Sequence, residues 1–480
     1  MNDNFEIVIG LEVHAELNTK SKIFCSCKNE FGAEPNTLCC PVCTGMPGTL
    51  PVLNQQVVEH AVKMGHALHC GINNVTKQDR KNYFYPDLPK AYQISQFDVP
   101  LCEKGYLDIF AGEEIRRIGV TRIHIEEDAG KLIHDDSTGG TLADYNRCGV
   151  PLIEIVSEPD MRSAEEAKVY MEGIANILLY LGISDAKMQE GSMRADVNVS
   201  VRPKGQKEYG TRAEMKNVNS FSAVFRAVEY EANRQIEILS KGGTVEQETR
   251  RWDDGKGKSL LMRSKEDAQD YRYFPDPDLL TFVVPAQRVQ QLKEEVPELP
   301  LARAQRYMGE FLLSQYDAFL LTADKARADF FDAAVGLGLC EAKAVANWLL
   351  GDILKLLNDQ KLLLQDTALT PANLAKMIAL IEKGAISGAA GKKILEVILT
   401  QDQNPEELVQ KLGLAQISDT SALQAIVSKV LATNPKAVAD YKAGKTNVLG
   451  FVVGQCMRES KGQGNPALLK EMIEAAIQAL

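Results

Sequence analysis

Residues 120–160 read VTRIHIEEDAGKLIHDDSTGGTLADYNRCGVPLIEIVSEPD, a stretch in which clusters of carboxylates stand directly beside apolar runs. Glu154 lies inside one of these runs, in the segment 151–156. A carboxylate on a half-buried strand needs a cation, a hydrogen-bond network or a raised pKa, because desolvating an unpaired charge is costly. The stretch therefore predicts a polar site that is built on β-strands.

An apolar face and a charged face alternate in several other segments. In residues 5–17 the charged face carries Glu12, His14 and Glu16, and in residues 193–201 it carries Asp196 and Asn198. A solvated face of an antiparallel sheet is one interpretation of this pattern. Because Asp, Glu and Asn are poor strand formers, we favour the other interpretation, a face whose carboxylates and histidine bind magnesium and nucleotide phosphates.

The size and charge of the chain limit its class. Its 480 residues exceed what one hydrophobic core usually supports, so several domains are expected. The formal net charge of −11 argues against a protein that coats nucleic acid over its whole surface. The N-terminus MNDNFEIVIG has no targeting pattern, and no apolar run approaches the roughly 18 residues of a membrane span. We therefore expect a cytoplasmic protein that does not enter a membrane.

Two common phosphate-binding motifs do not fit the sequence. Residues 255–259, GKGKS, resemble the end of a P-loop, but the first glycine of that motif would fall at Trp252. No GxGxxG run supports a Rossmann nucleotide site. If ATP binds to this chain, we expect it on a metal-bearing sheet.

Half of the ten cysteines cluster within residues 25–43. Cys25-x-Cys27 and Cys40-x-x-Cys43 are two close pairs, typical of the four thiolates of a tetrahedral structural zinc site. Cys39 offers a substitute ligand, and buried free thiols are the alternative interpretation. Such clustering in a reducing compartment favours a metal over disulfides, so we predict a zinc knuckle that pins this loop.

Residues 79–96, DRKNYFYPDLPKAYQISQ, interleave basic and aromatic side chains. These are Arg80, Lys81 and Lys90 among Tyr83, Phe84, Tyr85 and Tyr92. Basic groups beside aromatic faces suit a phosphate and a stacked base, as at the single-stranded end of an RNA. A loop whose aromatic side chains fill the core and whose charges face water has the same composition, so both interpretations stay open.

The pattern changes from strands to helices near residue 296. Stretches such as AKAVANWLLGDILKLLN carry apolar residues at spacings of three and four, and Thr370 with Pro371 forms a helix start. We predict an α+β chain with a mainly antiparallel domain at 1–295, a helical domain at 296–410 and a helical tail domain at 411–480. In residues 435–461, five basic side chains stand against two acidic ones, a surplus that suits an RNA backbone; a helical interaction module is the alternative.

Long motifs are spread over the whole chain. They are IGLEVHAEL, FGAEPN, RKNYFYPDLPKAYQISQFDVPL, HIEEDAGK, PLIEIVSEPDMRS, QEGSMRADVNVSVRP, AEMKNVNSF, QETRRWDD and DYRYFPDPDL. Together they resemble the B subunit of the tRNA-dependent amidotransferases. That family converts misacylated Glu-tRNA(Gln) or Asp-tRNA(Asn) to the amidated tRNA, as a carbon–nitrogen ligase with glutamine as amido donor.

The resemblance implies a fold, a reaction and partners. It implies an N-terminal cradle similar in fold to glutamine synthetase, where ATP and magnesium serve to phosphorylate the side-chain carboxylate of the tRNA-bound amino acid before ammonia displaces the phosphate. It implies a heterotrimer in which the partners are an amidase (the A subunit) and a small C subunit, and a tail that contacts tRNA. The chain shows no Ser/Ser/Lys amidase signature, and Cys148 is interpreted as a packing residue, so the ammonia is expected from a partner.

The same motifs imply the site residues. The magnesium ligands implied are Glu12, His14, Glu127 and Glu154, with Lys81 as a further catalytic residue. The residues implied for ATP are Asp196, Glu214, Lys216 and Arg80. Alternation places Glu126, not Glu127, on the face of His124, but HIEEDAG ends in a turn where alternation can break, so Glu127 is preferred.

Two functions of other classes stay open. A non-catalytic tRNA scaffold would need only the helical tail and would leave the carboxylate-lined sheet unexplained. A metal-dependent hydrolase would use the Glu and His cluster to activate water. Dependence on ATP and formation of an acyl phosphate would separate both from an amidotransferase.

Overall fold

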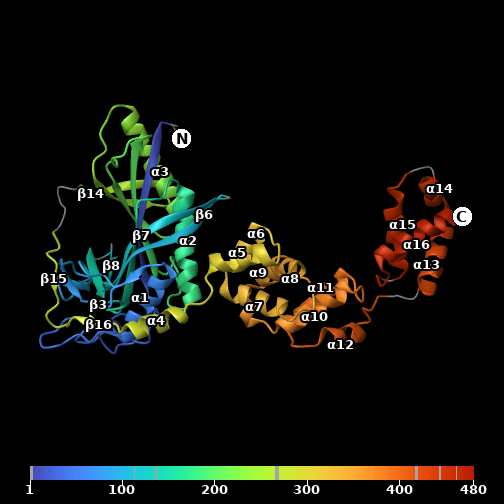
Figure 1. Ribbon diagram of the computed structural model, residues 1–480, viewed down its shortest axis with the longest axis horizontal. Helices are drawn as coiled ribbons and strands as arrows, with labels where there is room; N and C mark the ends of the chain where they lie inside the picture. Colours follow the sequence, from blue (N-terminus) through green and yellow to red (C-terminus); the bar gives the residue numbers. More distant parts are fainter. Residues whose placement is uncertain are drawn as a thin grey trace. The chain divides into compact units, whose positions relative to one another are not determined.

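The computed structural model describes residues 4–112, 114–135, 137, 139–264, 270–416, 420–442, 445–460 and 462–479. The chain divides into two compact units, residues 1–300 and 301–480. Unit 1 contains the strands, and unit 2 is built from helices and the loops between them (Figure 1). The predicted order, a mainly antiparallel sheet followed by an all-helical region, is confirmed.

A nine-stranded sheet forms the centre of unit 1. Its strands, in spatial order, are β14 (Lys258–Ser264), β13 (Glu248–Asp253), β12 (Ala213–Val218), β11 (Met193–Pro203), β1 (Phe5–Glu16), β10 (Pro151–Ser157), β7 (Glu114–Glu127), β6 (Cys102–Ala111) and β2 (Gly71–Ile72). Every neighbouring pair is antiparallel except β12 and β13, which are parallel. The strand β1, which the alternation in residues 5–17 predicts, therefore lies near the middle of the sheet.

The odd-numbered residues of β1 form part of a helix-covered core. Ile9, Leu11, Val13 and Ala15 are at most 1% exposed and belong to one buried cluster. The same cluster includes the apolar residues of the helices α1 (Gln55–Ala67), α2 (Ala164–Leu181) and α3 (Phe221–Ser240). Because side chains alternate along a strand, the even-numbered residues of β1 lie on the opposite face.

Local sequence signals set the ends of α2. The side chain of Ser163 accepts a hydrogen bond from the backbone N–H of Glu166, which satisfies one free donor of the first turn. Gly182 ends the helix with φ +67°, in the left-handed region that glycine adopts without strain. The helix that follows the stretch 120–160 is thus capped at both ends by its own sequence.

Three smaller sheets complete unit 1. They are β15 (Phe274–Pro275), β4 (Asp79–Asn82) and β5 (Tyr92–Ser95); β16 (Phe282–Val283) and β3 (Val75–Thr76); and β8 (Lys131–Asp135) and β9 (Gly140–Asp144). The helix α4 (Ala286–Glu294) packs on α1 through the core residue Leu292. The basic and aromatic stretch 79–96 therefore forms the hairpin β4–β5, which is closed by residues 274–275.

Unit 2 contains two separate buried clusters. The first lies among α5 (Pro300–Glu310), α6 (Gln315–Thr322), α7 (Lys325–Val335), α8 (Ala342–Trp348), a π-helical turn (Leu349–Ile353), α9 (Leu354–Gln360), α10 (Pro371–Glu382), α11 (Gly388–Ile398) and α12 (Pro405–Lys411). The second lies among α13 (Thr420–Thr433), α14 (Pro435–Lys442), α15 (Val448–Glu459) and α16 (Pro466–Ala479). The start of α10 is the predicted one, since Thr370 caps the helix and Pro371 is its first residue. The domain boundaries at 295 and 410 and the likeness to glutamine synthetase stay predictions.

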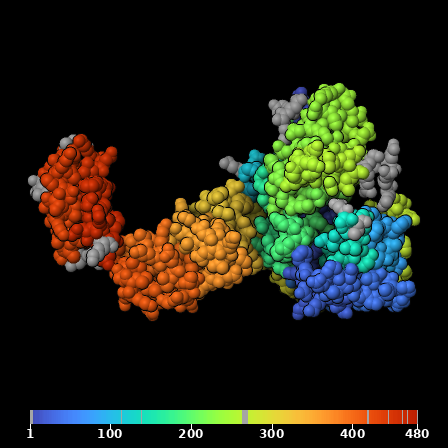
Figure 2. Space-filling view, turned by 180° about the vertical axis from the view of Figure 1, so that it is seen from behind, coloured from blue at the N-terminus to red at the C-terminus, as the bar shows by residue number. Residues whose placement is uncertain are grey.

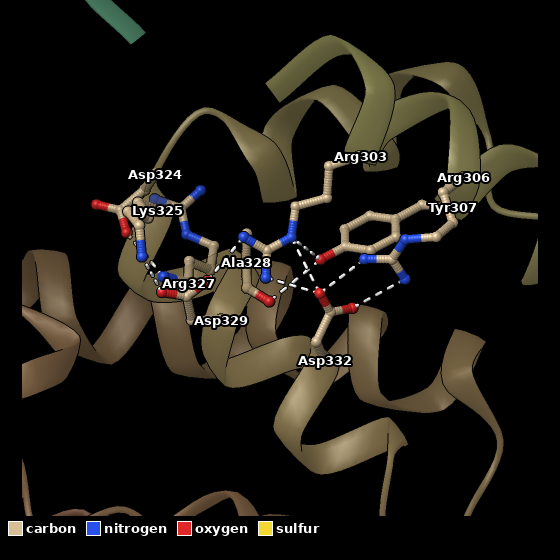
Figure 3. Close-up of polar contacts among 9 residues, drawn as sticks. All are labelled: Arg303, Arg306, Tyr307, Asp324, Lys325, Arg327, Ala328, Asp329 and Asp332. Atoms are coloured by element: carbon tan, nitrogen blue, oxygen red, sulfur yellow. Dashed lines mark hydrogen bonds and ion pairs between the residues drawn. The ribbon is translucent and has the colours of Figure 1, made fainter. Parts of the chain in front are cut away.

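A buried arginine joins α5 to α7 (Figure 3). The side chain of Arg303 is 8% exposed and donates to Asp329 Oδ1 and to Asp332 Oδ2, each at 2.7 Å. It also donates to the hydroxyl of Tyr307 at 3.0 Å, which in turn donates to the carbonyl of Ala328 at 3.1 Å. Each polar group of this network therefore has a partner within the helical unit.

We expect Arg303→Met to lower the free energy of unfolding of the helical unit by about 2 kcal/mol, because Asp329 and Asp332 would lose a buried cation, although Lys325 and Arg306 still pair with them. The loss stays below that of a fully buried pair, since Asp329 is half exposed. Urea unfolding of the full chain, followed by circular dichroism, measures the change. Lys325→Met is the matched control, because Lys325 binds the same Asp329 from an exposed position. Equal effects of the two substitutions would contradict the prediction.

None of the described helices is long and apolar enough to cross a membrane.

Candidate functional site on the polar face of the sheet

The register of the sheet aligns charged side chains in rows. His14 of β1 lies opposite Glu154 of β10, and Glu154 lies opposite His124 of β7. Two residues before His14 on β1, Glu12 lies opposite Asp196 of β11. All five residues belong to the even-numbered face, which is turned away from the helices. In the space-filling view, unit 1 is hollowed between its green segments and its blue and cyan segments (Figure 2).

The first row, together with Glu126 two residues further along β7, forms a group of two histidines and two carboxylates. His14 Nε2 lies 3.3 Å from Glu154 Oε2 and 3.6 Å from Glu126 Oε1. His124 Nε2 contacts the same two side chains, at 3.3 Å from Glu154 Oε2 and 3.6 Å from Glu126 Oε2. Atoms of His14, Glu126 and Glu154 all lie within 4.8 Å of one another, so the three side chains can hold one cation.

The carboxylates of this group raise the pKa of both histidines. Burial would lower the pKa of His124, but Glu154 and Glu126 raise it to about 9. Burial would also lower the pKa of His14, and hydrogen bonding and charge from Glu154 raise it above its ordinary value. Burial would raise the pKa of Glu154, but His124 and His14 hold it well below its usual range. A metal ion at His14 would therefore compete with a proton.

A second acidic group lies next to the first on β1. Oxygens of Glu12, Asp196 and Glu214 lie within 4.8 Å of one another. Lys216 of β12 bridges two of them, since its Nζ forms an ion pair with Asp196 and lies 3.0 Å from Glu214 Oε1. Asn198 donates to Glu12 Oε1 at 3.0 Å. Three carboxylates with oxygen donors at this spacing form a ligand set that suits magnesium.

Burial and neighbouring charges shift the pKa values of the second group. Burial raises the pKa of Glu12, and the charges of Glu154 and Asp196 raise it further. Burial would lower the pKa of Lys216, but Asp196 and Glu214 raise it. The ammonium of Lys216 thus stands between carboxylates whose negative charge would also attract a divalent cation.

A hollow of about 570 Å³ continues from the second group along β1. Its lining includes Gly10, Glu12, Asn198, Ser200, Tyr209 and Arg212. Gly10 lies two residues before Glu12 and so faces the same side of the sheet. The volume lies within the range of small-molecule sites, at the edge of the acidic group.

Lys81 of β4 stands beside the first group. Burial would lower its pKa, but the charge of Glu126, with those of Tyr273 and Glu154, raises it, so Lys81 is a cation at neutral pH. Its Nζ lies 5.1 Å from the centre of the Tyr271 ring and 5.9 Å from that of Tyr83. The neighbouring Phe84 and Tyr85 are 82% and 57% exposed, so part of the predicted aromatic stretch does face outward.

The structure does not bring Arg80 to these groups. Its guanidinium donates to Asp276 Oδ2 at 2.8 Å and to Asp278 Oδ2 at 2.9 Å. The Cζ atom of Arg80 also lies 4.2 Å from the centre of the Tyr92 ring. The resemblance implies Arg80 as an ATP ligand, but here both of its carboxylate partners come from residues that no local pattern connects with it. Arg80 ties β4 to the segment that follows β15.

Glu127 lies on the other side of β7 from the acidic groups, contrary to its predicted place beside His14 and Glu154. Its carboxylate forms an ion pair with Lys90 and accepts from the backbone N–H of Ile94 at 2.9 Å. The strand continues through Glu127, so alternation does not break at this point. Glu126 therefore takes the place that family matching assigns to Glu127. The sequence signal that identifies Glu126 and His124 is the plain alternation of residues 122–126.

The four predicted zinc ligands come together. Atoms of Cys25, Cys27, Cys40 and Cys43 lie within 4.8 Å of one another, and Cys39 is not part of the group. Two thiolates of a tetrahedral site with Zn–S bonds of about 2.3 Å stand roughly 3.8 Å apart; the Sγ atoms of Cys40 and Cys43 are 3.9 Å apart. The residues present therefore fit a structural zinc ion.

The environment of Cys43 favours a thiolate. A hydrogen bond from Cys25 lowers its pKa to about 5 against the effect of burial, with help from the backbone of Cys40 and the charge of Lys22. Burial raises the pKa of Cys148 to about 12, which suits the packing role expected for that residue. Within the four-cysteine group the thiolate is thus favoured at Cys43, whereas the hydrogen bond to Cys43 raises the pKa of Cys25 and burial raises that of Cys27 to about 11.

Comparisons with known proteins identify the family of the chain. The family model for the GatB/GatE catalytic domain matches residues 7–290, and the model for the GatB domain matches residues 329–477. Known B subunits of aspartyl/glutamyl-tRNA(Asn/Gln) amidotransferase are similar over nearly the full length. The protein of Caldicellulosiruptor bescii is 54% identical over 99% of this chain and 100% of its own. That of Thermoanaerobacter pseudethanolicus is 53% identical over 98% of each chain, and that of Brevibacillus brevis is 52% identical over 99% of each. The chain therefore belongs to the family of the B subunits of the aspartyl/glutamyl-tRNA(Asn/Gln) amidotransferases.

Proposed function

We propose that this chain carries the site at which an amidotransferase complex phosphorylates and then amidates the amino acid of a misacylated tRNA. One observation carries the proposal: two acidic groups, around His14 and around Glu12, adjoin on one face of the central sheet. Two neighbouring cation sites suit phosphoryl transfer, in which negative charge spreads over the phosphoryl oxygens. The names of the relatives point to the substrates, Glu-tRNA(Gln) and Asp-tRNA(Asn).

The residues of the two groups would hold magnesium. His14, Glu126 and Glu154 form one ligand set, and Glu12, Asp196 and Glu214 form the other. Bound magnesium would neutralise phosphoryl oxygens and draw electrons away from phosphorus. The ligand set carried over from the family thus keeps Glu12, His14 and Glu154 and replaces Glu127 by Glu126.

The reaction has two steps, and two lysines serve both. An oxygen of the substrate carboxylate forms a bond to the γ-phosphorus of ATP while the bond to ADP breaks. The nitrogen of ammonia then bonds to the acyl carbon, a proton leaves that nitrogen, and phosphate departs. Lys216 and Lys81 remain ammonium ions next to the carboxylate groups, which places fixed positive charge where oxyanions develop.

The hollow beside Glu12 is the proposed place of the nucleotide. It opens from the acidic group that would bind the phosphates through magnesium, and polar groups of Asn198, Ser200 and Arg212 line it. Gly10 has no side chain that could fill the hollow, and a strand glycine allows a ligand to approach the backbone closely. Asp196, Glu214 and Lys216 lie at the phosphate end of this arrangement.

We expect Gly10→Ile to raise the KM for ATP by at least about tenfold, because the side chain would fill part of the hollow. Steady-state ATP hydrolysis measures the change. Gly10→Ala is the matched control, since a Cβ at this position would come no closer than 3.8 Å to any atom outside its neighbours. An unchanged KM in Gly10→Ile would show that ATP binds elsewhere.

The ammonia and the tRNA require partners and other parts of the chain. The proposed complex contains an amidase (the A subunit), which releases ammonia from glutamine, together with a small C subunit. For the tRNA we propose the helices α13–α16, whose basic residues include Lys436, Lys442 and Arg458. Of the basic residues in this region, Lys461 lies outside the described residues.

We also propose a structural zinc ion in unit 1, at Cys25, Cys27, Cys40 and Cys43.

The direct test is ATP hydrolysis by the chain co-expressed with candidate A and C subunits. We expect hydrolysis only with misacylated Glu-tRNA(Gln) or Asp-tRNA(Asn) and magnesium, and its loss in EDTA. Hydroxylamine should trap the acyl phosphate as a hydroxamate. Hydrolysis of a tRNA ester without ATP would instead identify a metal-dependent hydrolase, and tRNA binding without either reaction would identify a scaffold.

A further inference from the structure

A lysine is completely buried beside the four-cysteine group. Lys22 is 1% exposed and ranks among the largest fully buried side chains of the described residues. Its Nζ lies 3.8 Å from Cys43 Sγ, within the distance of an N–H···S hydrogen bond. The backbone N–H of Cys40 donates to the same sulfur at 3.0 Å. Two donors therefore converge on Cys43.

Lys22 has no carboxylate as its ion-pair partner within the described part of the chain. The acid on its side of β7 is Glu127. A Cβ built on Gly149 would lie 3.7 Å from Lys22 Cδ and 3.9 Å from Glu127 Oε2, so both side chains approach the open side of Gly149. Glu127 is already neutralised by Lys90 and is further held by the N–H of Ile94.

A buried ammonium without an anion is strongly unfavourable, because desolvation is not repaid. The anion-forming atom that Lys22 contacts is the sulfur of Cys43, and the nearby carboxylate of Glu127 already pairs with Lys90. Four thiolates around one divalent cation carry a net charge of −2. A positive charge next to such a centre offsets part of its negative charge. The ammonium of Lys22 and the thiolate of Cys43, the buried member of the group, therefore stabilise each other.

We propose that Lys22 is the counter-cation of a dianionic zinc tetrathiolate centre formed by Cys25, Cys27, Cys40 and Cys43, and that it sets the zinc affinity of this centre. The proposal rests on the zinc site named above and goes beyond it by assigning its charge partner. Lys22 acts through Cys43 and is a positioning residue, since an ammonium has no lone pair for the metal. Outer partners of this kind typically change metal affinity by about 10- to 100-fold.

The test compares Lys22→Met with Lys20→Met, an exposed lysine two residues earlier. Zinc content of the full chain is measured by atomic emission, and zinc transfer to a chromogenic chelator gives the relative dissociation constants. We expect Lys22→Met to raise the dissociation constant about 10- to 100-fold and Lys20→Met to leave it unchanged. Cys43→Ser establishes the signal for a damaged site, and Lys22→Arg should recover part of the affinity because it keeps the charge.

A second measurement separates charge from packing. With zinc bound, Lys22→Met should lower the Tm; after the zinc has been stripped, it should raise the Tm, because a buried unpaired charge has been removed. Equal zinc affinity in Lys22→Met and wild type would overturn the proposal, and so would a Tm loss of the same size in both forms. A wild-type chain that binds no zinc would overturn it as well. ATP hydrolysis is assayed separately, so failure here leaves the amidotransferase proposal untouched.

Discussion

The substitution Glu154→Gln is expected to lower tRNA-dependent ATP hydrolysis by about a thousandfold while tRNA binding stays within about twofold of wild type. Glu154 is 8% exposed and lies between the two histidines of the first group. The amide keeps the shape of the side chain but removes the charge that both imidazoles and a magnesium ion would share. Glu154→Gln should therefore lower the rate of ATP hydrolysis while the chain still folds.

Glu158→Gln is the matched control for this experiment, because it makes the same chemical change on an exposed side chain that accepts a hydrogen bond from Thr121. Single-turnover phosphorylation with misacylated tRNA measures the chemical step, and filter binding measures tRNA affinity. If Glu154→Gln lost tRNA binding and kept its phosphorylation rate, the role assigned to the first group would be wrong.

The substitution Lys216→Met is expected to lower the turnover number about a hundredfold and, in the opposite direction, to lower the magnesium concentration needed for half-maximal activity. Lys216 is the ammonium that pairs with Asp196 and Glu214. Without it, Asp196 and Glu214 lose an ammonium partner and attract magnesium more strongly. The positive charge that would stabilise the phosphoryl oxygens is lost at the same time. The turnover number should therefore fall while the affinity for magnesium rises.

Titration of activity with magnesium measures both quantities. Lys216→Arg keeps the charge and should recover part of the turnover, and Lys207→Met removes an exposed lysine from the loop between β11 and β12 as a control. A turnover number that stays at the wild-type value in Lys216→Met would exclude Lys216 from the reaction. A parallel rise in the magnesium requirement would contradict the charge argument.

The sequence by itself determined the two faces of the sheet, the helical nature of unit 2 and the family. Side chains alternate along a strand with period two, so residues 5–17 and 193–201 divide into apolar and charged sets without any knowledge of their neighbours. The cap at Thr370 and Pro371 is likewise a local matter of one side chain and one backbone N–H. Thiol spacing placed the four cysteines together, because the loop that carries them is short.

Tertiary structure decided which charged residues meet. Alternation shows that His14 and Glu154 are both on a polar face, but only the register of β1 with β10 sets them opposite each other. The choice between Glu126 and Glu127 depended on where β7 ends, because alternation holds up to the last residue of the strand, Glu127. Arg80 found its partner Asp276 at a sequence separation of 196 residues. No sequence pattern around Lys22 indicates that its side chain is buried beside Cys43. Pairings of this kind depend on hydrogen-bond register and burial between distant segments, which no local pattern encodes.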